Sequence, residues 1–343
     1  MIRITMFSSA DKIAGQGVGS AYLELINLLR KYHARELKVT VNRYNKTDIS
    51  HYHTINPTFF LSTFFRNQFG KRIGYVHFLP STLKGSIHLP RWIELMLYSY
   101  IIVFYKRMDH LVVVNPSFIE ELEKYGIETN KISYIPNFVS KETFYPIEKA
   151  RKKNMRDHLG VAESQFVVLG AGQIQERKGI LDFIKLAKEM PEIQFIWVGG
   201  FSFGKITDGY DKFTELIKHC PENLRFPGIV KREDMCSFYN LADVFLLPSF
   251  DELFPMCILE AFSCDKPVIL RDLDLYLPIL KGYYEPASDR REMKKIINNM
   301  IADPDYYQSL VQKSIDGCKI YSEERLAKIW LSFYKRQAKT SSF

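Results

Sequence analysis

The chain has 343 residues, of which 46% are hydrophobic, which is enough for about two α/β domains with packed cores. Such a composition excludes a largely disordered chain. The net charge of +8 is uneven, because residues 1–150 carry +7 and the remainder carries +1.

The N-terminal residues predict a strand followed by a glycine-rich loop. Residues 2–7 form an apolar run that indicates a buried strand rather than a secretory leader. The segment GQGVG contains Gly17 and Gly19 and precedes a helix expected over 21–32. Its third glycine comes one residue early for a dinucleotide fingerprint, and the strand expected at 39–44 ends without an acid for a ribose. The spacing therefore argues against a nicotinamide site, which stays open as the alternative to another role for the loop.

Residues 51–107 mix basic and aromatic side chains and carry a net charge of +6. Such a surface suits an anionic membrane or a nucleic acid, and the apolar runs at 59–65 and 92–105 favour lipid. The run at 95–105 is shorter than the ~20 residues of a membrane span. Alternatively, the aromatic residues form a domain core and the charges a solvated face. The residues predicted to meet the membrane are Phe64, Phe65, Arg66, Lys71, Arg72, Arg91 and Trp92.

Strand-like runs and helical patterns alternate along the rest of the chain, which predicts parallel sheets covered by helices on both faces. Further strands are expected at 73–77, 111–114, 132–135, 166–169, 195–198, 244–247 and 267–270. A polar, charged stretch at 140–164 predicts a domain boundary. The predicted domains are residues 1–150 and 151–321, followed by a helical segment 322–343 that packs back across the junction. Ligands should then bind at the carboxyl ends of the strands, in a cleft between the domains.

The five cysteines indicate the redox state of the compartment in which the protein is found. All five lie in the second half of the chain, and none belongs to a C-x-x-C pair. This usage is typical of a reduced, cytoplasmic compartment in which thiols are small core residues.

The segment PSFDELFPMCILEAF contains Glu252 and Glu260, separated by seven residues. The strand expected at 244–247 leads into it, and a helix is expected from Met256. Glu252 should therefore lie in a loop at a strand's carboxyl end, and Glu260 two turns along the helix. Carboxylates accept paired sugar hydroxyls, and free N–H groups at a helix start bind hydroxyls or negative oxygens. On spacing alone, two solvated glutamates are the alternative.

A second segment, GAGQIQERKGILDF, places Arg177 and Lys178 in a turn before Gly179 opens a helix. Two cations at a helix start suit a diphosphate, because the helix dipole is positive there. Taken alone, the segment is more consistent with an ordinary basic turn.

Taken in order, these segments resemble the retaining nucleotide-sugar glycosyltransferases of family four. The resemblance covers nearly the whole chain and includes GQGVG, IGYVH, VNPS, IPNFV, ERKG and the two glutamates. It implies the GT-B fold, an α/β architecture of two Rossmann-like doubly wound domains, with a UDP-sugar donor and no metal. Residues 1–150 would then bind the acceptor and the membrane, and residues 151–321 would bind the nucleotide-sugar. It implies catalytic roles for His77, Glu252, Arg177 and Lys178. It implies donor binding by Gly17, Gly19, Asn137, Arg177, Lys178, Phe254, Pro255, Met256 and Glu260.

Within this resemblance, each residue has an implied task. Arg177 and Lys178 would hold the diphosphate, Glu252 would lie at the sugar and Glu260 would bind the ribose hydroxyls. His77 would lie near the transferred sugar.

The sequence departs from the family at the first glutamate. The usual E-G-F-G or E-P-F-G is replaced by E-L-F-P-M, in which Pro255 has no N–H for a backbone contact. This form is similar to the Gram-positive branch that glycosylates diacylglycerol lipids, which includes galactosyltransferases acting on glucosyl-diacylglycerol.

That branch implies a function at the membrane. It implies transfer of α-galactose or α-glucose from a UDP-sugar to glucosyl-diacylglycerol, in membrane glycolipid and lipoteichoic-acid anchor synthesis, on the inner face of the cell membrane. Alternatives are glucosyl transfer to diacylglycerol, transfer to a non-lipid polysaccharide, and a membrane-recruiting protein without catalysis. Nucleic acid is not expected as a partner.

Overall fold

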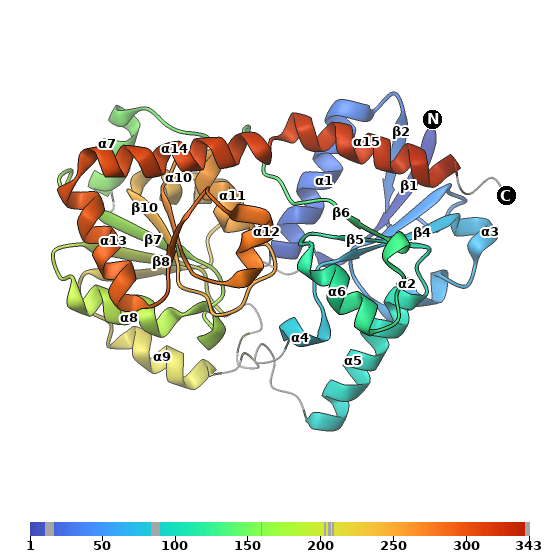
Figure 1. Ribbon diagram of the computed structural model, residues 1–343, viewed down its shortest axis with the longest axis horizontal. Coiled ribbons are helices and arrows are strands. Elements are labelled where there is room, and N and C mark those ends of the chain that lie inside the picture. The colour runs from blue at the N-terminus through green and yellow to red at the C-terminus, as the bar shows by residue number, and fades with distance from the viewer. Residues whose placement is uncertain are drawn as a thin grey trace. The chain divides into compact units, whose positions relative to one another are not determined.

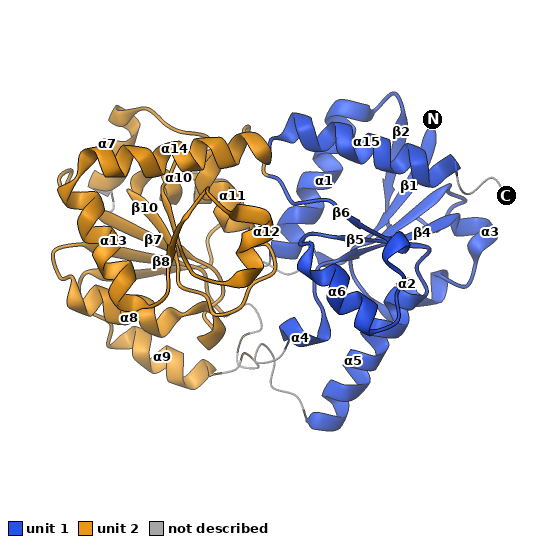
Figure 2. Cartoon of the chain, viewed as in Figure 1, with its two compact units in different colours: residues 1–84, 89–138, 321–343 blue, residues 85–88, 139–320 orange. Residues whose placement is uncertain are grey.

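The computed structural model describes residues 1–10, 17–83, 90–158, 160–201, 204, 207 and 209–339. The chain forms two compact units (Figures 1 and 2). Unit 1 contains residues 1–84, 89–138 and 321–343, and unit 2 contains residues 139–320. Each unit is built on one six-stranded sheet whose described strand pairs are all parallel, with helices on both faces. This confirms the predicted α/β class.

The sheet of unit 1 has the strand order β2-β1-β3-β4-β5-β6. Its strands are β1 (Ile2–Phe7), β2 (Leu37–Val41), β3 (Ile49–Tyr52), β4 (Lys71–Val76), β5 (His110–Val113) and β6 (Ile132–Tyr134). The strand order reverses between β1 and β3. The carboxyl ends beside such a reversal are where doubly wound sheets bind ligands.

The helices of unit 1 include one from each end of the chain. They are α1 (Gly17–His33), α2 (Pro57–Ser62), α3 (Arg66–Phe69), α4 (Pro80–Leu83), α5 (Arg91–Lys106), α6 (Ser117–Lys124) and α15 (Glu323–Lys339). The C-terminal helix α15 packs on α1, where His33 Nε2 lies 2.8 Å from the Ala327 carbonyl oxygen. Trp330 and Tyr334 of α15 are fully buried. Helix α15 is therefore part of the core of unit 1.

Gly17 and Gly19 do not lie in a loop as predicted, because they form the first turn of α1. Gly19 is buried, together with Ala21, Leu25 and Leu28 on the apolar side of the helix. Gly17, the first residue of the helix, is exposed. Gly15 lies outside the described residues.

The sheet of unit 2 has the order β12-β11-β10-β7-β8-β9, and the order reverses between β7 and β10. The strands are β7 (Val167–Ala171), β8 (Gln194–Val198), β9 (Leu224–Gly228), β10 (Val244–Leu247), β11 (Val268–Arg271) and β12 (Glu285–Ala287). The helices are α7 (Lys149–His158), α8 (Ile180–Glu189), α9 (Tyr210–Lys218), α10 (Arg232–Leu241), α11 (Met256–Ser263), α12 (Leu277–Leu280), α13 (Arg290–Ala302) and α14 (Pro304–Ile320).

The units divide after Phe138, not near residue 150. The segment after the division is bound to α10, because the Asn240 amide donates to the Tyr145 carbonyl at 2.9 Å and accepts from the Ile147 N–H at 3.0 Å. In α7, the buried Arg156 pairs with Asp243 at 2.7 Å. The polar stretch read as a boundary is therefore fixed to unit 2.

Candidate active site

The reversal point in the sheet of unit 2 brings the two predicted donor segments together. One loop follows β7 and contains a 3₁₀ helix, Glu176–Lys178, and the other runs from β10 to α11. Because β7 and β10 are neighbouring parallel strands, both loops leave the same edge of the sheet. The structure thus brings together Arg177, Lys178 and Glu252, which the sequence places about 75 residues apart.

The two loops are in direct contact. The Phe250 N–H donates to the Arg177 carbonyl at 2.7 Å, and the Arg177 guanidinium donates to the Asp251 carbonyl at 3.2 Å. Gly179 adopts φ 70°, and a β-carbon there would lie 2.1 Å from the Pro248 carbonyl oxygen. Only glycine therefore fits where the loops meet, and this contact sets the position of both cations.

Lys178 and Glu252 form a buried ion pair between the Nζ and Oε1 atoms. Burial alone would raise the pKa of the Glu252 carboxyl, but the charges of Lys178 and Arg177 outweigh it and hold that pKa below its usual value. Glu252 is therefore ionised at neutral pH. An incoming diphosphate could take Lys178 as a partner and leave the carboxylate for sugar hydroxyls.

Glu260 is held by two residues of α10. Its carboxylate accepts from Arg232 Nη1 at 2.7 Å and from the Tyr239 hydroxyl at 2.8 Å. Burial and the Glu260 charge raise the pKa of Tyr239, so its hydroxyl stays a donor. Sequence reasoning missed both residues, although their seven-residue spacing on one helix face is visible.

The residues around the start of α11 are mostly packed into the interior of unit 2. Phe254 and Met256 are buried, and Pro255 is the residue just before the helix. Their role in donor binding stays a prediction, and Pro255 has no N–H to contribute to it.

His77 lies in unit 1, just after β4, and is buried with two other histidines. His53 Nδ1 lies 3.3 Å from His77 Nε2, and the rings of His51 and His53 are 4.3 Å apart. Burial lowers the pKa of His51 and of His77 to about 3, and that of His53 well below 6.5. The three imidazoles are therefore neutral at neutral pH.

Asn137 belongs to the same cluster, because its side-chain oxygen accepts from the Tyr75 hydroxyl at 3.2 Å and the Tyr75 ring lies 4.3 Å from His77. The predicted site residues thus form two groups. His77, Asn137, Gly17 and Gly19 belong to unit 1, and Arg177, Lys178, Glu252 and Glu260 belong to unit 2.

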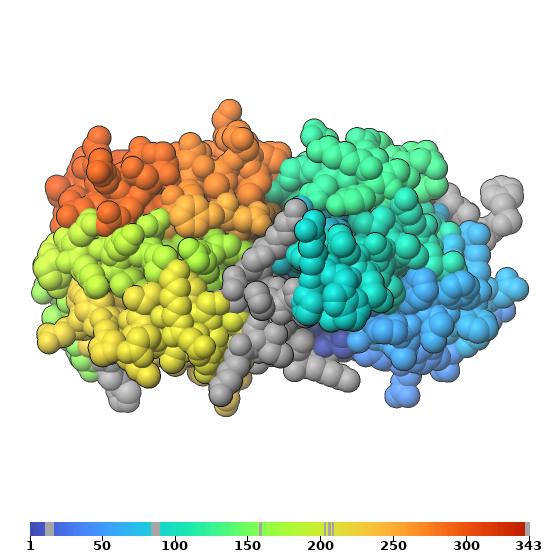
Figure 3. All heavy atoms as spheres, turned by 90° about the horizontal axis from the view of Figure 1, so that it is seen from below, coloured from blue at the N-terminus to red at the C-terminus, as the bar shows by residue number. Residues whose placement is uncertain are grey.

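An exposed apolar surface in unit 1 includes the predicted aromatic residues. Phe64, Phe65 and Trp92 are 57%, 61% and 65% exposed. Figure 3 shows the α2–α3 segment, in light blue, beside α5, in blue-green, and the rings of Phe60 and Tyr100 join them at 5.5 Å. We call this the α2–α5 surface; its exposed apolar members are Leu61, Phe64, Phe65, Trp92, Leu95, Met96 and Val103.

The predicted membrane cations differ in their surroundings. Arg72 is mostly buried and forms a two-point contact with Asp109, at 3.0 and 2.7 Å. Its prediction as a membrane residue is therefore corrected, because its guanidinium is occupied within the fold. Lys71 is partly buried, which lowers its pKa. Arg66 and Arg91 are exposed, although Arg66 also lies 3.5 Å from Asp109.

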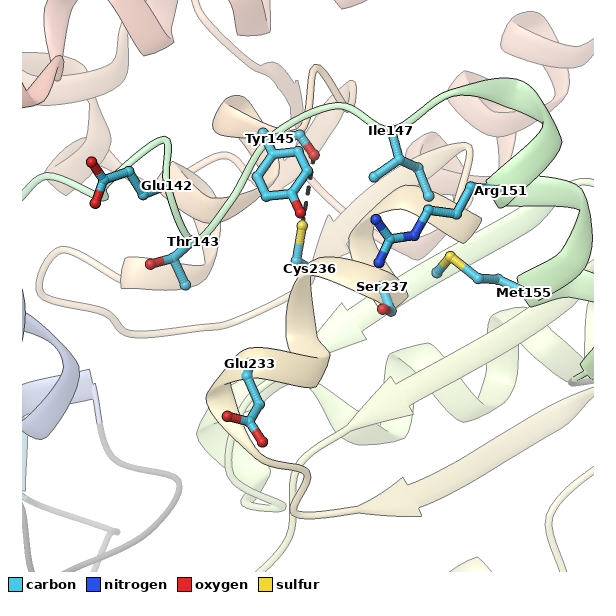
Figure 4. A pocket seen from close by; sticks show the side chains of 9 residues that line it. All are labelled: Glu142, Thr143, Tyr145, Ile147, Arg151, Met155, Glu233, Cys236 and Ser237. Atoms are coloured by element: carbon cyan, nitrogen blue, oxygen red, sulfur yellow. Dashed lines mark hydrogen bonds between the residues drawn. The ribbon is translucent and has the colours of Figure 1, made fainter.

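A separate hollow of about 310 Å³ lies in unit 2 between the segment leading into α7 and α10 (Figure 4). Cys236 lines it, and a hydrogen bond with the Cys264 thiol lowers the Cys236 pKa to about 6. None of its lining residues belongs to the predicted site. The five cysteines are free thiols.

Two observations concern the part of the chain that the structure describes. In that part of the chain, no group of three or more His, Cys, Asp or Glu is placed to hold a metal ion. No helix there is long and apolar enough to cross a membrane.

Known proteins are similar to this chain in sequence and in fold. Residues 16–143 match the family described as glycosyltransferase family 4, and residues 151–316 match glycosyl transferases group 1. The alpha-galactosylglucosyldiacylglycerol synthase of Streptococcus pneumoniae is 51% identical over 98% of this chain and 90% of its own length. The processive diacylglycerol alpha-glucosyltransferase of Acholeplasma laidlawii is 26% identical over 66% of this chain and 68% of its own. The Anabaena protein HepE, crystallised with UDP and glucose, superposes with a TM-score of 0.78 at 16% identity, covering 98% of this chain and 100% of its own.

Proposed function

The chain belongs to the family-4 glycosyltransferases with the GT-B fold, and we propose that it transfers α-galactose from a UDP-sugar to glucosyl-diacylglycerol with retention of configuration. The observation that carries this proposal is the 51% identity, over nearly the whole chain, to a synthase of that glycolipid. A product of this kind serves as a membrane glycolipid and as an anchor for lipoteichoic acid. Glucose as the transferred sugar remains a second candidate, supported by the weaker similarity to two glucosyl-transferring enzymes.

Unit 2 is proposed to hold the donor. As the sugar–phosphate bond breaks, negative charge builds on the departing diphosphate, and Arg177 and Lys178 would stabilise it. The support is their placement at the reversal point of the sheet, next to Glu252. Glu252 would then accept hydrogen bonds from the sugar. No metal is needed in this scheme.

The direct test is a transfer assay. The protein is incubated with UDP-galactose or UDP-glucose and with diacylglycerol or glucosyl-diacylglycerol, and the lipids are analysed by mass and by sugar composition. The proposal expects a galactosyl-glucosyl lipid from UDP-galactose and glucosyl-diacylglycerol. Product from bare diacylglycerol alone, or from none of the four combinations, would contradict it.

Glu260→Ala is expected to lower UDP affinity about tenfold or more, since a hydrogen bond to a charged group contributes roughly 1.5–3 kcal/mol. Calorimetry should compare UDP with 2′-deoxy-UDP. The wild type should prefer UDP, and the variant should discriminate less. Equal discrimination in both proteins would remove Glu260 from the ribose. Tyr239→Phe keeps the Glu260 carboxylate but deletes one of its hydrogen-bond donors. Its UDP affinity should lie between those of the wild type and Glu260→Ala.

Membrane docking is proposed for the α2–α5 surface, on the inner face of the cell membrane. The exposed residues of α5 recur at Trp92, Leu95, Met96 and Val103, which is the spacing of one helix face. Apolar insertion beside exposed cations is typical of reversible binding to anionic bilayers. This arrangement would bring the lipid acceptor to unit 1.

Replacing Trp92, Leu95 and Met96 by Ser should weaken sedimentation with anionic vesicles about tenfold or more, because each buried apolar side chain contributes ~1.5–3 kcal/mol. The matched control replaces Leu277 and Ile301 of unit 2, each 48% exposed, by Ser. Binding of the wild type should also fall with added salt. Equal loss in the control, or equal binding to neutral and anionic vesicles, would contradict docking through this surface.

A further inference from the structure

The three buried histidines of unit 1 lie on one face of its sheet. Strands β3 and β4 are parallel neighbours, with His51 opposite Ile73. Because side chains alternate along a strand, His51 and His53 share a face, as do Tyr75 and His77. Ring contacts of 4.3 to 5.6 Å link these four residues. His77 therefore sits in a packed aromatic cluster at the carboxyl ends of two adjacent strands.

His53 is fixed in place within this cluster. Its ring centroid lies 4.3 Å from His51, 5.0 Å from Tyr22 and 5.1 Å from Tyr75. His51 is itself fixed by α15, because its Nδ1 lies 2.7 Å from the Tyr334 hydroxyl. The His53 ring is therefore packed against three aromatic neighbours, and its Nδ1 lies 3.3 Å from His77 Nε2.

Two neutral imidazoles can share this contact in only two ways. If His53 Nδ1 carries the proton, it donates to His77 Nε2, and His77 carries its own proton on Nδ1. If His77 Nε2 carries the proton, His53 must carry its proton on Nε2. His53 Nε2 is buried and has no hydrogen-bond partner among the described residues. An unpaired buried N–H is rarer in folded proteins than an unpaired acceptor, which favours the first arrangement.

We propose that His53 is a positioning residue that donates from Nδ1 to His77 Nε2 and thereby fixes His77 in its Nδ1–H form, which presents a hydrogen-bond donor to a sugar hydroxyl. This inference rests on the proposed function, which gives His77 a place at the transferred sugar. The nitrogen of His77 not engaged by His53 is the one available to a substrate. His77 then acts as a fixed donor rather than as an acid or base.

The test uses two replacements that differ in one donor. His53→Asn places an amide nitrogen where Nδ1 stands, and His53→Leu fills similar space without a donor. With the transfer assay, His53→Leu should lower kcat about tenfold while UDP affinity stays unchanged, and His53→Asn should restore most of the loss. His110→Leu is the matched control, because His110 is also buried in unit 1 and bonded through one nitrogen, to Ser133 at 2.9 Å.

The tautomer itself is read by nitrogen NMR of the histidine-labelled protein without substrate, with His77 assigned through His77→Asn. A wild-type His77 protonated on Nδ1, and a changed His77 signal in His53→Leu but not in His110→Leu, would support the proposal. Protonation on Nε2, or full activity of His53→Leu, would overturn it. If the wild type transfers no galactose, the proposed function fails, yet the NMR result still decides the tautomer.

Discussion

Lys178→Met is expected to lower turnover by about 10²–10³-fold and also to destabilise unit 2. The loss of turnover follows from removing a fixed cation where charge develops on the diphosphate. The loss of stability follows from burial, because Glu252 would be left as an uncompensated carboxylate, at a cost of roughly 3–5 kcal/mol. Urea unfolding and the transfer assay measure the two effects separately. Met preserves the volume of the Lys178 stem, so a cavity does not confuse the result.

The double variant Lys178→Met/Glu252→Gln separates folding from catalysis. It removes both buried charges, so most of the stability should return while turnover stays low. Arg177→Ala is the companion, since Arg177 is only partly buried and should lose turnover with a smaller loss of stability. Near-normal turnover of folded Lys178→Met would exclude its role at the diphosphate. A double variant no more stable than Lys178→Met would exclude the buried-pair explanation.

Much of the proposed donor site was predictable because its residues follow strong local patterns. The apolar runs of β7 and β10 and the start of α11 predicted Lys178 and Glu252 in loops that follow strands, and Glu260 within a helix. The partners of these residues were not predictable. Arg232, which pairs with Glu260, belongs to another helix, and Lys178, which pairs with Glu252, lies in the loop after another strand. Local periodicity gives the position of a side chain along its element but not the residue opposite it.

Strand β3 escaped prediction for a physical reason. Its sequence, ISHY, is fully buried, yet Ser50 and His51 are polar, so it lacks the apolar run expected of a central strand. The interior supplies partners instead, with Ser50 donating to the Phe69 carbonyl and His51 meeting Tyr334. The polar residues that break the apolar pattern of β3 therefore include a member of the histidine cluster, His51.

Charge counting failed at Arg72 for a related reason. The stretch 51–107 is strongly basic, but Asp109 lies just beyond it. Asp109 precedes the neighbouring strand β5 and neutralises Arg72 of β4. A sum over a segment cannot distinguish a paired buried cation from an exposed one.

Unit 1 is expected to unfold in mild acid, at a higher pH than unit 2. His51, His53 and His77 have pKa values lowered by burial, whereas unfolded histidines titrate near 6.5. Below about pH 6.5 the unfolded state therefore binds more protons than the folded state, and stability falls as the pH falls. Each histidine contributes ~1.4 kcal/mol per pH unit, so the three together would cancel a typical stability of ~5–15 kcal/mol within a few pH units.

Unit 2 has a different acid window. The pKa of Glu252 is lowered in the fold, so its contribution is intact above the unfolded value of about 4.5 and is lost only below it. Tryptophan fluorescence can follow each unit, because Trp330 is buried 5.7 Å from His51 and Trp197 is buried in unit 2. A protein with Trp197→Phe and Trp92→Phe should report the transition of unit 1 near pH 5, and one with Trp330→Phe and Trp92→Phe that of unit 2 at lower pH.

The variant His51→Asn/His53→Asn should move the unit 1 midpoint to lower pH, because two groups no longer take up protons on unfolding while the contacts made through Nδ1 are retained. His219→Asn is the control, since His219 is exposed and pairs only with Glu215 of its own helix among the described contacts. It should leave both midpoints unchanged. If the double variant keeps the wild-type midpoint, the buried histidines are not the source of the acid transition. If both units unfold together near pH 4, the carboxylates rather than the histidines set the acid limit.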